Sequence, residues 1–380
     1  MIEYQICSNC IIDTNYDNKV KFYNGKCSYC INFEKKIRPS LEKNLNNQKK
    51  YSVDLFKRLK IDQKKNKTDH DCLIGVSGGV DSSYLVYHAV KNLKLNPLIY
   101  HVDTGWNNRI AVSNIEKLIN KFNLDLHTEV IDWNEIKDLT RSFLIAQVPY
   151  LESIQDHAIW ASTHLFSKKH KIKNILTGGN LQTECFRAPL YIAYYAGDLT
   201  IIKDIHKQFG EIELKKFPKL DIFYYKILYK LIYGIKLHQP LNFVNYNKKH
   251  AIKILSDEIG WENYGEKHHE SNHTKFFDGY WKKIKFGHDA RVGQLSSLIV
   301  NNQIRRSDAL LEIKKDGYNK DLIHKEFKYI AEKLDFTINE LKEILIGKNK
   351  YYYDYKSKSH FLKLSTFILR LLNLENRNIK

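Results

Sequence analysis

The stretch "CLIGVSGGVDSSYLVYHAV", Cys72–Val90, contains the pattern that decides the fold. A short apolar segment ends at Ser77-Gly78-Gly79, and a helical pattern follows from Asp81. Unpaired N–H groups at the start of a helix attract an anion, and glycines let a phosphate approach the backbone because they have no Cβ. Ser82 and Ser83 add hydroxyl donors. The stretch therefore predicts a phosphate-binding loop between a strand and a helix.

Strands and helices alternate along the chain after this loop. The expected strands are 71–77, 97–103, 126–131 and 173–179, and the expected helices are 81–93, 109–122, 135–146 and 153–170. This order predicts an α/β fold, in which a parallel sheet has helices on both faces. Ligands bind such sheets at the carboxyl ends of the strands, where Asp103 ends the second strand and Gly178 and Gly179 end the fourth. A turn-capping role is the alternative for Asp103.

Four of the six cysteines lie within the first 30 residues. They form two C-x-x-C pairs, Cys7 with Cys10 and Cys27 with Cys30, separated by 16 residues. Two such pairs complete a tetrahedral zinc site, and four thiolates leave no open position for a catalytic water. We expect a small N-terminal module folded around structural Zn²⁺. Disulfide bonds are the alternative, and a reducing compartment disfavours them.

The chain is strongly basic, with a formal net charge of +18, 43% hydrophobic residues and 27% charged residues. Excess positive charge favours an anionic partner such as a nucleotide, a sugar nucleotide or nucleic acid. Lysines spread over helix surfaces would produce the same excess, so charge does not choose between these partners. Apolar runs stay shorter than the roughly 18 residues that span a bilayer. No secretory pattern follows Met1. We expect a cytoplasmic protein without a membrane span.

The segment Ser77–Ser83 lacks the lysine of a Walker A loop. It resembles the S-G-G-x-D-S signature of the PP-loop ATP pyrophosphatases, which have an adenine nucleotide alpha hydrolase-like fold. The resemblance implies that ATP, with Mg²⁺, is cut between its α- and β-phosphates and that AMP is transferred to a substrate oxygen. It assigns ATP binding to Ser77, Gly78, Gly79, Asp81, Ser82, Ser83, Asp103, Gly178 and Gly179, and it gives Asp81 a part in catalysis.

Three further segments resemble one branch of this superfamily, the N-acetyl sugar amidotransferases of lipopolysaccharide O-antigen and flagellin-sugar biosynthesis. The segments are 101–118, 176–184 and 264–299, and the two cysteine pairs fit the same branch. The resemblance implies adenylation of the acetamido group of a nucleotide-linked N-acetyl sugar, followed by displacement of AMP by ammonia to give an acetamidino group. The sequence has no G-x-C-x-G nucleophile motif, so the resemblance also implies a separate glutaminase subunit that supplies ammonia.

The segment 264–299 is dense in residues suited to phosphate binding and proton transfer. Lys267, Lys285 and Arg291 would bind a pyrophosphate group or take part in catalysis. Glu270 or His268 would accept a proton from the attacking nitrogen. A solvated helix face is the alternative for each residue taken singly, but their crowding favours a site.

Two other functions stay open. Cys185 follows "LTGGNLQTE", and the PP-loop enzymes that thiolate tRNA use a reactive cysteine in this domain. Such an enzyme would bind tRNA through the basic surface. An isolated cysteine is more often a small apolar residue, and no second cysteine is suitably placed. A zinc-ribbon adaptor with a degenerate nucleotide fold is the third reading, and the intact loop pattern disfavours it.

The chain is expected to divide into six segments. They are a zinc-binding module over 1–35, a helical linker over 36–68, the PP-loop domain over 69–205, an aromatic and basic helical insertion over 206–245, a helical substrate-binding region over 246–345 and an amphipathic tail over 346–380. The apolar stripes of 220–237 and 361–374 either pack internally or dock a partner.

Overall fold

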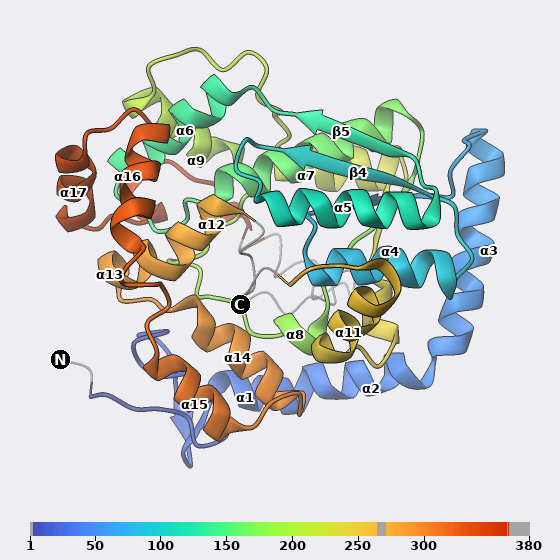
Figure 1. Ribbon diagram of the computed structural model, residues 1–380, viewed down its shortest axis with the longest axis horizontal. Helices are drawn as coiled ribbons and strands as arrows, with labels where there is room; N and C mark the ends of the chain where they lie inside the picture. The colour runs from blue at the N-terminus through green and yellow to red at the C-terminus, as the bar shows by residue number, and fades with distance from the viewer. Residues whose placement is uncertain (1–2, 264–270, 363, 365–380) are drawn as a thin grey trace.

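A computed structural model describes residues 3–263, 271–362 and 364 (Figure 1). Within these residues, no helix has the length and apolar character needed to cross a bilayer. The segment 264–270 lies outside the described residues. Of the predicted tail over 346–380, residues 363 and 365–380 also lie outside them.

The centre of the fold is a five-stranded parallel sheet with the strand order β5-β4-β3-β6-β7. The strands are β3 (Cys72–Gly75), β4 (Pro97–Asp103), β5 (Leu126–Val130), β6 (Asn174–Leu176) and β7 (Lys236–His238). Ile74 of β3 aligns with Ile99 of β4 and Leu176 of β6. The next strands along the chain, β4 and β5, lie on one side of β3, and β6 and β7 lie on its other side, so the strand order reverses at β3. The crevice for a ligand lies at this reversal.

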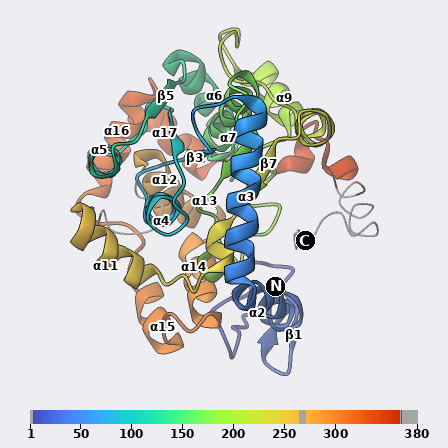
Figure 2. The same cartoon turned by 90° about the vertical axis from the view of Figure 1, so that its right-hand side faces the viewer.

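Alternate residues of β3 contact opposite helix layers, as the two-residue period of a strand requires. Leu73 packs in the cluster that includes α6 (Trp133–Ile145), α7 (Ser153–Lys169) and α9 (Leu199–Phe209). Ile74 packs in the cluster that includes α4 (Val80–Lys91), α5 (Arg109–Phe122) and α11 (Lys248–Ile259). Figure 2 shows α4 and α5 on one side of the strands and α7 and α9 on the other. The predicted parallel sheet with helices on both faces is confirmed.

The N-terminal segment forms a small hairpin followed by a helical arm. The hairpin pairs β1 (Phe22–Tyr23) with β2 (Lys26–Cys27) around the turn Asn24-Gly25, where both residues have positive φ. The arm consists of α1 (Ser28–Asn32), η1 (Phe33–Ile37), α2 (Arg38–Asn46) and α3 (Gln48–Asn66), and it runs along the edge of the molecule (Figures 1 and 2). Leu55 and Leu59 of α3 are buried in the same cluster as Ile74.

The C-terminal region is helical and contacts the loop that follows β4. Its elements are α12 (Asn272–Phe276), η4 (Phe277–Trp281), α13 (Lys282–Phe286), α14 (Ala290–Val300), α15 (Arg306–Lys314), α16 (Ile323–Lys333), α17 (Ile338–Ile346) and η5 (Tyr352–Asp354). Ser271 forms a β-bridge with Asn107, and the Asn272 N–H donates to the Trp106 carbonyl at 2.9 Å. These contacts place the start of this region at the carboxyl edge of the sheet.

The region between β6 and α11 contains more than the helices expected there. Its elements are α8 (Leu181–Glu184), α9, α10 (Ile222–Tyr224), η2 (Tyr225–Ile232), β7 and η3 (Pro240–Phe243). The strand β7 lies in a stretch where the sequence predicted only helix. It pairs with β6 because the Lys236 N–H donates to the Lys173 carbonyl and the Thr177 N–H donates to the His238 carbonyl. Three residues are too few to show a strand period, so this edge strand is decided by its pairing.

Candidate active site

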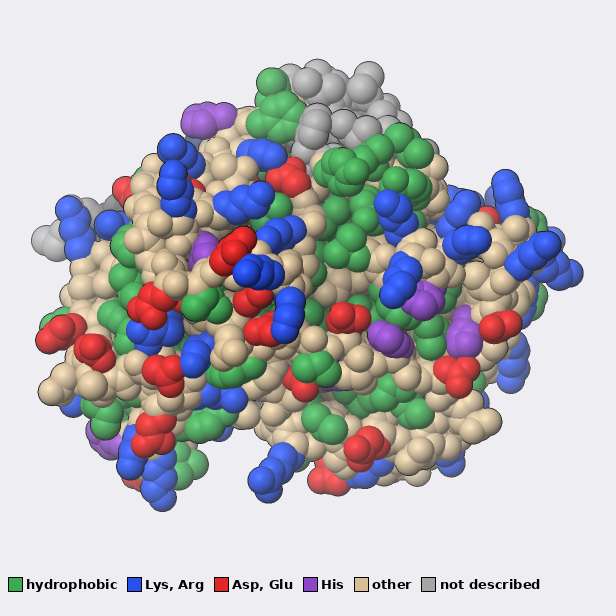
Figure 3. All heavy atoms as spheres, turned by 90° about the horizontal axis from the view of Figure 1, so that it is seen from above, with side chains coloured by type: hydrophobic (Ala, Val, Ile, Leu, Met, Phe, Trp, Pro, Cys, Tyr) green, Lys and Arg blue, Asp and Glu red, His purple; other side chains and the backbone are tan. Residues whose placement is uncertain are grey.

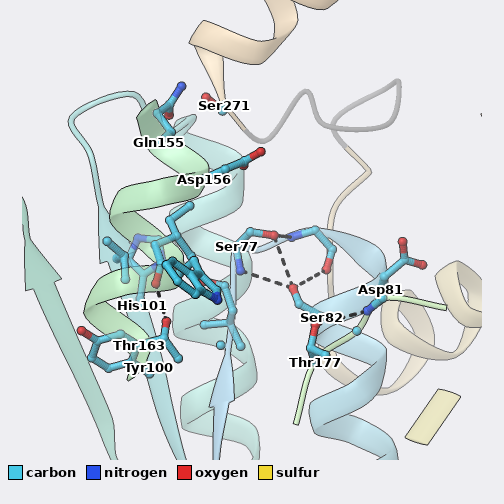
Figure 4. A pocket seen from close by; sticks show the side chains of 18 of the residues that line it. Ser77, Asp81, Ser82, Tyr100, His101, Gln155, Asp156, Thr163, Thr177 and Ser271 are labelled. Carbon is cyan, nitrogen blue, oxygen red and sulfur yellow. Dashed lines mark hydrogen bonds between the residues drawn. The ribbon is translucent and has the colours of Figure 1, made fainter. Parts of the chain in front are cut away.

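A cavity of about 570 Å³ opens at the carboxyl ends of β3, β4 and β6 (Figure 4). Small-molecule sites in proteins commonly enclose roughly 300–1,000 Å³, so a nucleotide-sized ligand fits this space. Most of the residues predicted to bind ATP line it, namely Ser77, Gly79, Asp81, Ser82, Gly178 and Gly179. The structure thus brings the loop after β3 and the loop after β6 together around one cavity.

The loop after β3 is shaped by its own hydroxyl groups. Ser82 Oγ accepts from the Ser77 N–H at 3.3 Å and donates to the Gly79 carbonyl at 3.1 Å. The Gly79 N–H donates to Ser77 Oγ at 3.3 Å (Figure 4). α4 begins at Val80, and its first residues line the cavity. A helix N-terminus and flanking serine hydroxyls form a site for a phosphate group.

Two aromatic residues that are distant in sequence hold this loop from outside. The Trp261 indole N–H donates to the Gly78 carbonyl at 3.2 Å, and the buried Tyr246 hydroxyl donates to Asp81 Oδ1. Burial and the Asp81 carboxylate raise the pKa of Tyr246 far above its ordinary range. The Tyr246 hydroxyl therefore stays protonated and keeps the Asp81 carboxylate in a defined orientation beside the first turn of α4.

The three remaining residues predicted to bind ATP do not line the cavity. Gly78 packs against α5, and Ser83 is buried with an Oγ that has no hydrogen-bond partner among the described residues. Asp103 Oδ1 accepts from the Gly105 N–H at 2.7 Å, so its carboxylate caps the turn after β4.

The wall of the cavity nearest the sheet is largely apolar. It is formed by Tyr100 and Val102 of β4, Ile159 and Trp160 of α7, and Leu237 of β7. Gly75 also lines the cavity, and a Cβ placed on it would meet no atom within 4 Å. His164 Nδ1 contacts the Trp160 carbonyl at 2.7 Å, which leaves Nε2 without a partner in the described part of the chain. Space beside a glycine, apolar walls and one buried acceptor suit a flat heteroaromatic ring.

Polar side chains line other parts of the cavity. His101 contacts the Val76 carbonyl through Nδ1 and Asn107 Nδ2 through Nε2, both at 2.9 Å. Gln155 Oε1 accepts from the Thr104 hydroxyl at 2.9 Å, and Figure 4 shows Gln155 and Ser271 at the end of the cavity away from Tyr100. Ser271 and Thr274 bring the C-terminal region into the cavity wall. One ligand there would contact both the nucleotide fold and the C-terminal region.

The described residues that line the cavity are more acidic than basic. The carboxylates are Asp81, Glu152, Asp156 and Glu184, and Lys248 is the single Lys or Arg among them. Carboxylate oxygens are hard ligands of the kind that Mg²⁺ prefers. An anionic nucleotide in this lining would need a cation such as Mg²⁺ beside it, and Asp81 would be one carboxylate able to hold that ion.

Glu152 belongs to a charge cluster that extends from the cavity into the C-terminal region. Lys282 Nζ lies 2.7 Å from the Glu152 carboxylate and 2.5 Å from Asp278. Burial raises the pKa of Glu152 to about 8, and the Asp278 carboxylate adds to this shift while Lys282 opposes it. Burial lowers the pKa of the neighbouring His273 to about 3, so its ring is neutral. One ammonium thus faces two carboxyl groups, and the negative charge of Asp278 increases the proton affinity of Glu152.

This cluster predicts a pH dependence of stability. The pKa of Glu152 is raised from an ordinary 4.5, so the folded state binds the proton more tightly than the unfolded state. Its contribution to the free energy of unfolding is complete below about pH 4.5 and is lost as the pH rises to about 8. The slope is at most about 1.4 kcal/mol per pH unit. We expect Glu152→Gln to flatten this dependence in urea denaturation curves, whereas Glu116→Gln, on the exposed side of α5, retains it. Parallel pH profiles of Glu152→Gln and the parent would contradict this assignment.

The predicted catalytic residues of 264–299 lie in different surroundings. Lys267 and Glu270 fall outside the described residues. Lys285 Nζ donates to the carbonyls of Ile344 and Gly347 at 2.8 Å, and burial lowers its pKa to about 8. Arg291 pairs with Asp289 at 2.7 Å. Neither Lys285 nor Arg291 lines the large cavity, and Arg291 lines a second hollow of about 90 Å³.

The four N-terminal cysteines form one buried cluster. Their sulfur atoms all lie within 4.8 Å of one another, with Cys7 and Cys30 at 3.8 Å and Cys10 and Cys27 at 3.7 Å. Tetrahedral thiolates about 2.3 Å from one ion are roughly 3.8 Å apart. In a [4Fe–4S] cluster each thiolate binds a different iron, which requires wider separations. The cluster has the geometry of a site for a single metal ion.

The cysteine module is attached to the C-terminal region through α14 and α15. The Arg306 guanidinium donates from Nε to the Cys10 carbonyl and from Nη2 to the Cys7 carbonyl, both at 2.8 Å. The Ser296 hydroxyl accepts from the Ile11 N–H at 3.3 Å. The cysteine module therefore braces the helices that follow the cavity-lining segment.

We expect Arg306→Ala to lower the free energy of unfolding by about 2–3 kcal/mol, because two carbonyls lose charged donors. Urea denaturation monitored by tryptophan fluorescence measures this loss. Arg305→Ala is the matched control, because the exposed Arg305 pairs with Asp308 on the surface and such exposed pairs contribute little to stability. Equal losses of unfolding free energy in the two variants would show that the two hydrogen bonds from Arg306 to the cysteine module do not contribute to stability.

The parallel sheet, the cavity at the reversal of its strand order and the S-G-G-x-D-S loop define a nucleotide-binding fold of the PP-loop type. Residues 270–368 match the family model described as "LPS biosynthesis protein WbpG-like, C-terminal domain". A curated relative, the tRNA(Ile)-lysidine synthase of Mycoplasma mycoides subsp. mycoides, is 23% identical over 317 residues, which cover 76% of this chain and 70% of the relative. The C-terminal region of this chain is thus similar to a domain from lipopolysaccharide biosynthesis.

Three solved structures are also similar to this chain. The NMN synthetase from Francisella tularensis is 14% identical with a TM-score of 0.28, over 59% of this chain and 95% of that one. The U34-tRNA thiolase NcsA from Methanococcus maripaludis, with its [4Fe-4S] cluster, is 12% identical with a TM-score of 0.36, over 87% and 89%. The NH3-dependent NAD synthetase from Campylobacter jejuni subsp. jejuni is 13% identical with a TM-score of 0.28, over 75% and 94%.

Several cavity residues were missed by reasoning from sequence. They are Glu152, Gln155, His164, Lys248 and Thr274 together with the supporting Tyr246 and Trp261. For α7 a signal was present, because Gln155, Thr163 and His164 are polar residues on the buried part of a helix between two packed layers. Buried polar residues usually have a partner, so such a helix face indicates a polar ligand or cavity. The supporting aromatic residues left no local signal.

Proposed function

We propose that this protein is an ATP-dependent amidotransferase that acts on a nucleotide-linked N-acetyl sugar. ATP would adenylate the acetamido oxygen, and ammonia would then displace AMP to form an acetamidino group. The observation that carries the proposal is the shared cavity, because the S-G-G-x-D-S loop and residues of the WbpG-like segment, Ser271 and Thr274, line the same space. An activated nucleotide and a sugar substrate held there would meet without leaving the site.

The chemistry of the site supports an adenylation step. An amide oxygen is a poor leaving group until it is bonded to phosphate. The first turn of α4 and the hydroxyls of Ser77 and Ser82 offer donors to the phosphates, and Lys248 adds a positive charge. Mg²⁺ bound with Asp81 would offset negative charge on the departing pyrophosphate.

The test is to incubate the protein with ATP, Mg²⁺, an ammonium salt and a panel of UDP-linked acetamido sugars. The proposal expects AMP and pyrophosphate only when an acceptor sugar is present. If the acetamido oxygen carries a heavy isotope, the label should appear in the AMP. Unlabelled AMP, or AMP released equally without sugar, would refute the proposed reaction.

We further propose that ammonia comes from a separate glutaminase subunit and that the reaction takes place in the cytoplasm, where ATP and sugar nucleotides are made. The isolated chain should then use an ammonium salt but not glutamine. The cysteine cluster would hold structural Zn²⁺, since its sulfur separations suit one tetrahedral ion.

A PP-loop enzyme that modifies tRNA is the second candidate, favoured by the match to a tRNA(Ile)-lysidine synthase. Two observations oppose the thiolase form of this candidate. Burial raises the pKa of Cys185 to about 12, so its thiol is protonated at neutral pH, and Cys185 does not line the cavity. On the face seen in Figure 3, Lys and Arg side chains are interspersed with Asp and Glu. Release of AMP on addition of tRNA, without sugar, would favour this candidate.

A further inference from the structure

We propose that Glu152 is the base of the amination step and that the part of the cavity wall it shares with Gln155 is the subsite for the acetamido group; the inference rests on the proposed function. Glu152 immediately precedes α7, and Gln155 lies one turn further along. Both side chains line the cavity that the phosphate loop also lines. The two residues thus lie where an amide could be held while its oxygen faces the nucleotide.

Gln155 provides the evidence for a ligand at this place. Its side chain is only 7% exposed, and the Thr104 hydroxyl occupies its Oε1 at 2.9 Å. Its Nε2 has no hydrogen-bond partner among the described residues, although a buried amide donor normally has one. A substrate oxygen in the cavity would satisfy this donor. Asn107 and Ser271, joined by a β-bridge, border the same space.

Glu152 has the charge environment of a base that accepts a proton near neutral pH. Lys282 is shared between Glu152 and Asp278, and the neutral His273 adds no positive charge. Glu152 Oε1 has no partner in the described part of the chain, so one carboxylate oxygen is available to an N–H group. A carboxylate with raised proton affinity is an effective general base at cellular pH.

The step can be written with its atoms balanced. The nitrogen of ammonia attacks the carbon of the adenylated acetamido group, and a C–N bond forms. One N–H proton passes to the Glu152 carboxylate. The C–O bond to AMP then breaks, and its electron pair leaves with the oxygen on AMP. The product is a protonated amidine, and Glu152 afterwards releases its proton to solvent.

This arrangement gives the C-terminal region a direct part in the reaction. Asp278 and Lys282 lie in the WbpG-like segment, whereas Glu152 and Gln155 lie in the nucleotide-binding domain. Asp278 and Lys282 are positioning residues in this scheme, because they set the proton affinity of Glu152 without contacting the substrate.

The deciding experiment separates the two half-reactions in Glu152→Gln. Adenylation is followed by sugar-dependent exchange of labelled pyrophosphate into ATP, and amination by ammonia-dependent formation of AMP. We expect exchange to stay within about threefold of the parent and amination to fall by roughly 100-fold or more. Glu116→Gln is the matched control and should retain both rates.

Each other result is informative. Full amination by Glu152→Gln, or equal loss of both half-reactions, overturns the role of Glu152 and leaves the proposed function standing. Absence of sugar-dependent exchange in the parent protein overturns the proposed function and this inference with it.

A second variant tests whether the Asp278 carboxylate raises the proton affinity of Glu152. Asp278→Asn leaves Lys282 to Glu152 alone, so the pH at which amination is half-maximal should move to lower values by about one pH unit. The profile is measured at a constant concentration of free ammonia, because ammonia itself titrates. A variant with normal pyrophosphate exchange and an unmoved profile would exclude Glu152 as the titrating base.

Discussion

Replacing Cys10 with Ser is expected to abolish metal binding and to unfold the N-terminal module. Cys10 contributes one of four sulfur atoms that lie within 4.8 Å of one another, and three thiolates bind Zn²⁺ much more weakly than four. Zinc binding in small four-ligand modules contributes about 10–16 kcal/mol, which is also the folding free energy of the module. A hairpin whose strands have two residues each cannot replace that contribution.

The effect should extend beyond the module. Its apolar residues share a core with Val292 and Val300 of α14 and with Phe186. Loss of the metal should therefore loosen α14 and α15, which would appear as new sites of limited proteolysis near residue 300. Metal content by mass spectrometry and the thermal midpoint are the direct measurements.

Cys185→Ser is the matched control, because Cys185 is a thiol outside the cluster whose sulfur accepts a weak hydrogen bond from Asn301 at 3.7 Å. It should retain the full metal content. Stoichiometric metal and an unchanged thermal midpoint in Cys10→Ser would contradict the four-thiolate site. Iron with sulfide in place of zinc would contradict the assignment of the ion.

Replacing Gly78 with Ala is expected to weaken nucleotide binding strongly. Gly78 has a φ of +79°, a conformation that costs an L-residue roughly 1–2 kcal/mol. A Cβ at this position would also lie 2.3 Å from the Ala111 carbonyl oxygen, which is fixed within α5. The loop must therefore move away from α5, and this breaks the hydrogen bonds of Ser77, Gly79 and Ser82 that shape the phosphate site. We expect ATP affinity, measured by calorimetry, to fall at least about 100-fold.

Gly260→Ala separates the effect of the positive φ from the effect of the collision with α5. Gly260 ends α11 with a φ of +72°, but a Cβ there would meet no atom within 4 Å. This variant has the cost of the left-handed backbone without the collision, so it should be mildly destabilised and bind ATP normally. If Gly78→Ala and Gly260→Ala bind ATP equally well, the close approach of the loop to α5 has no part in forming the phosphate site.

The strands and helices of the nucleotide-binding domain could be predicted because their signals are local. The predicted strand 97–103 and helix 109–122 coincide with β4 and α5. The edge strand β7 was not predicted, because three residues carry no period and the pairing with β6 decides it. Of the loop-motif residues, Ser77, Gly79, Asp81 and Ser82 line the cavity, whereas Gly78 and Ser83 face away from it because the fold packs them against other elements. Asp103, placed only by its position at a strand end, caps a turn outside the cavity lining.

The sequence by itself determined the α/β fold, the phosphate loop and the four-cysteine cluster, because each depends on residues that are close together along the chain. The tertiary structure alone decided that Tyr246 holds Asp81, that Arg306 braces the cysteine module and that Lys282 pairs with Glu152. These contacts join residues from distant segments, and their energies depend on burial and charge that only the folded chain creates. The phosphate-loop pattern was therefore recognisable in seven consecutive residues, whereas the cavity wall formed by α7 and the C-terminal region could be seen only in the folded chain.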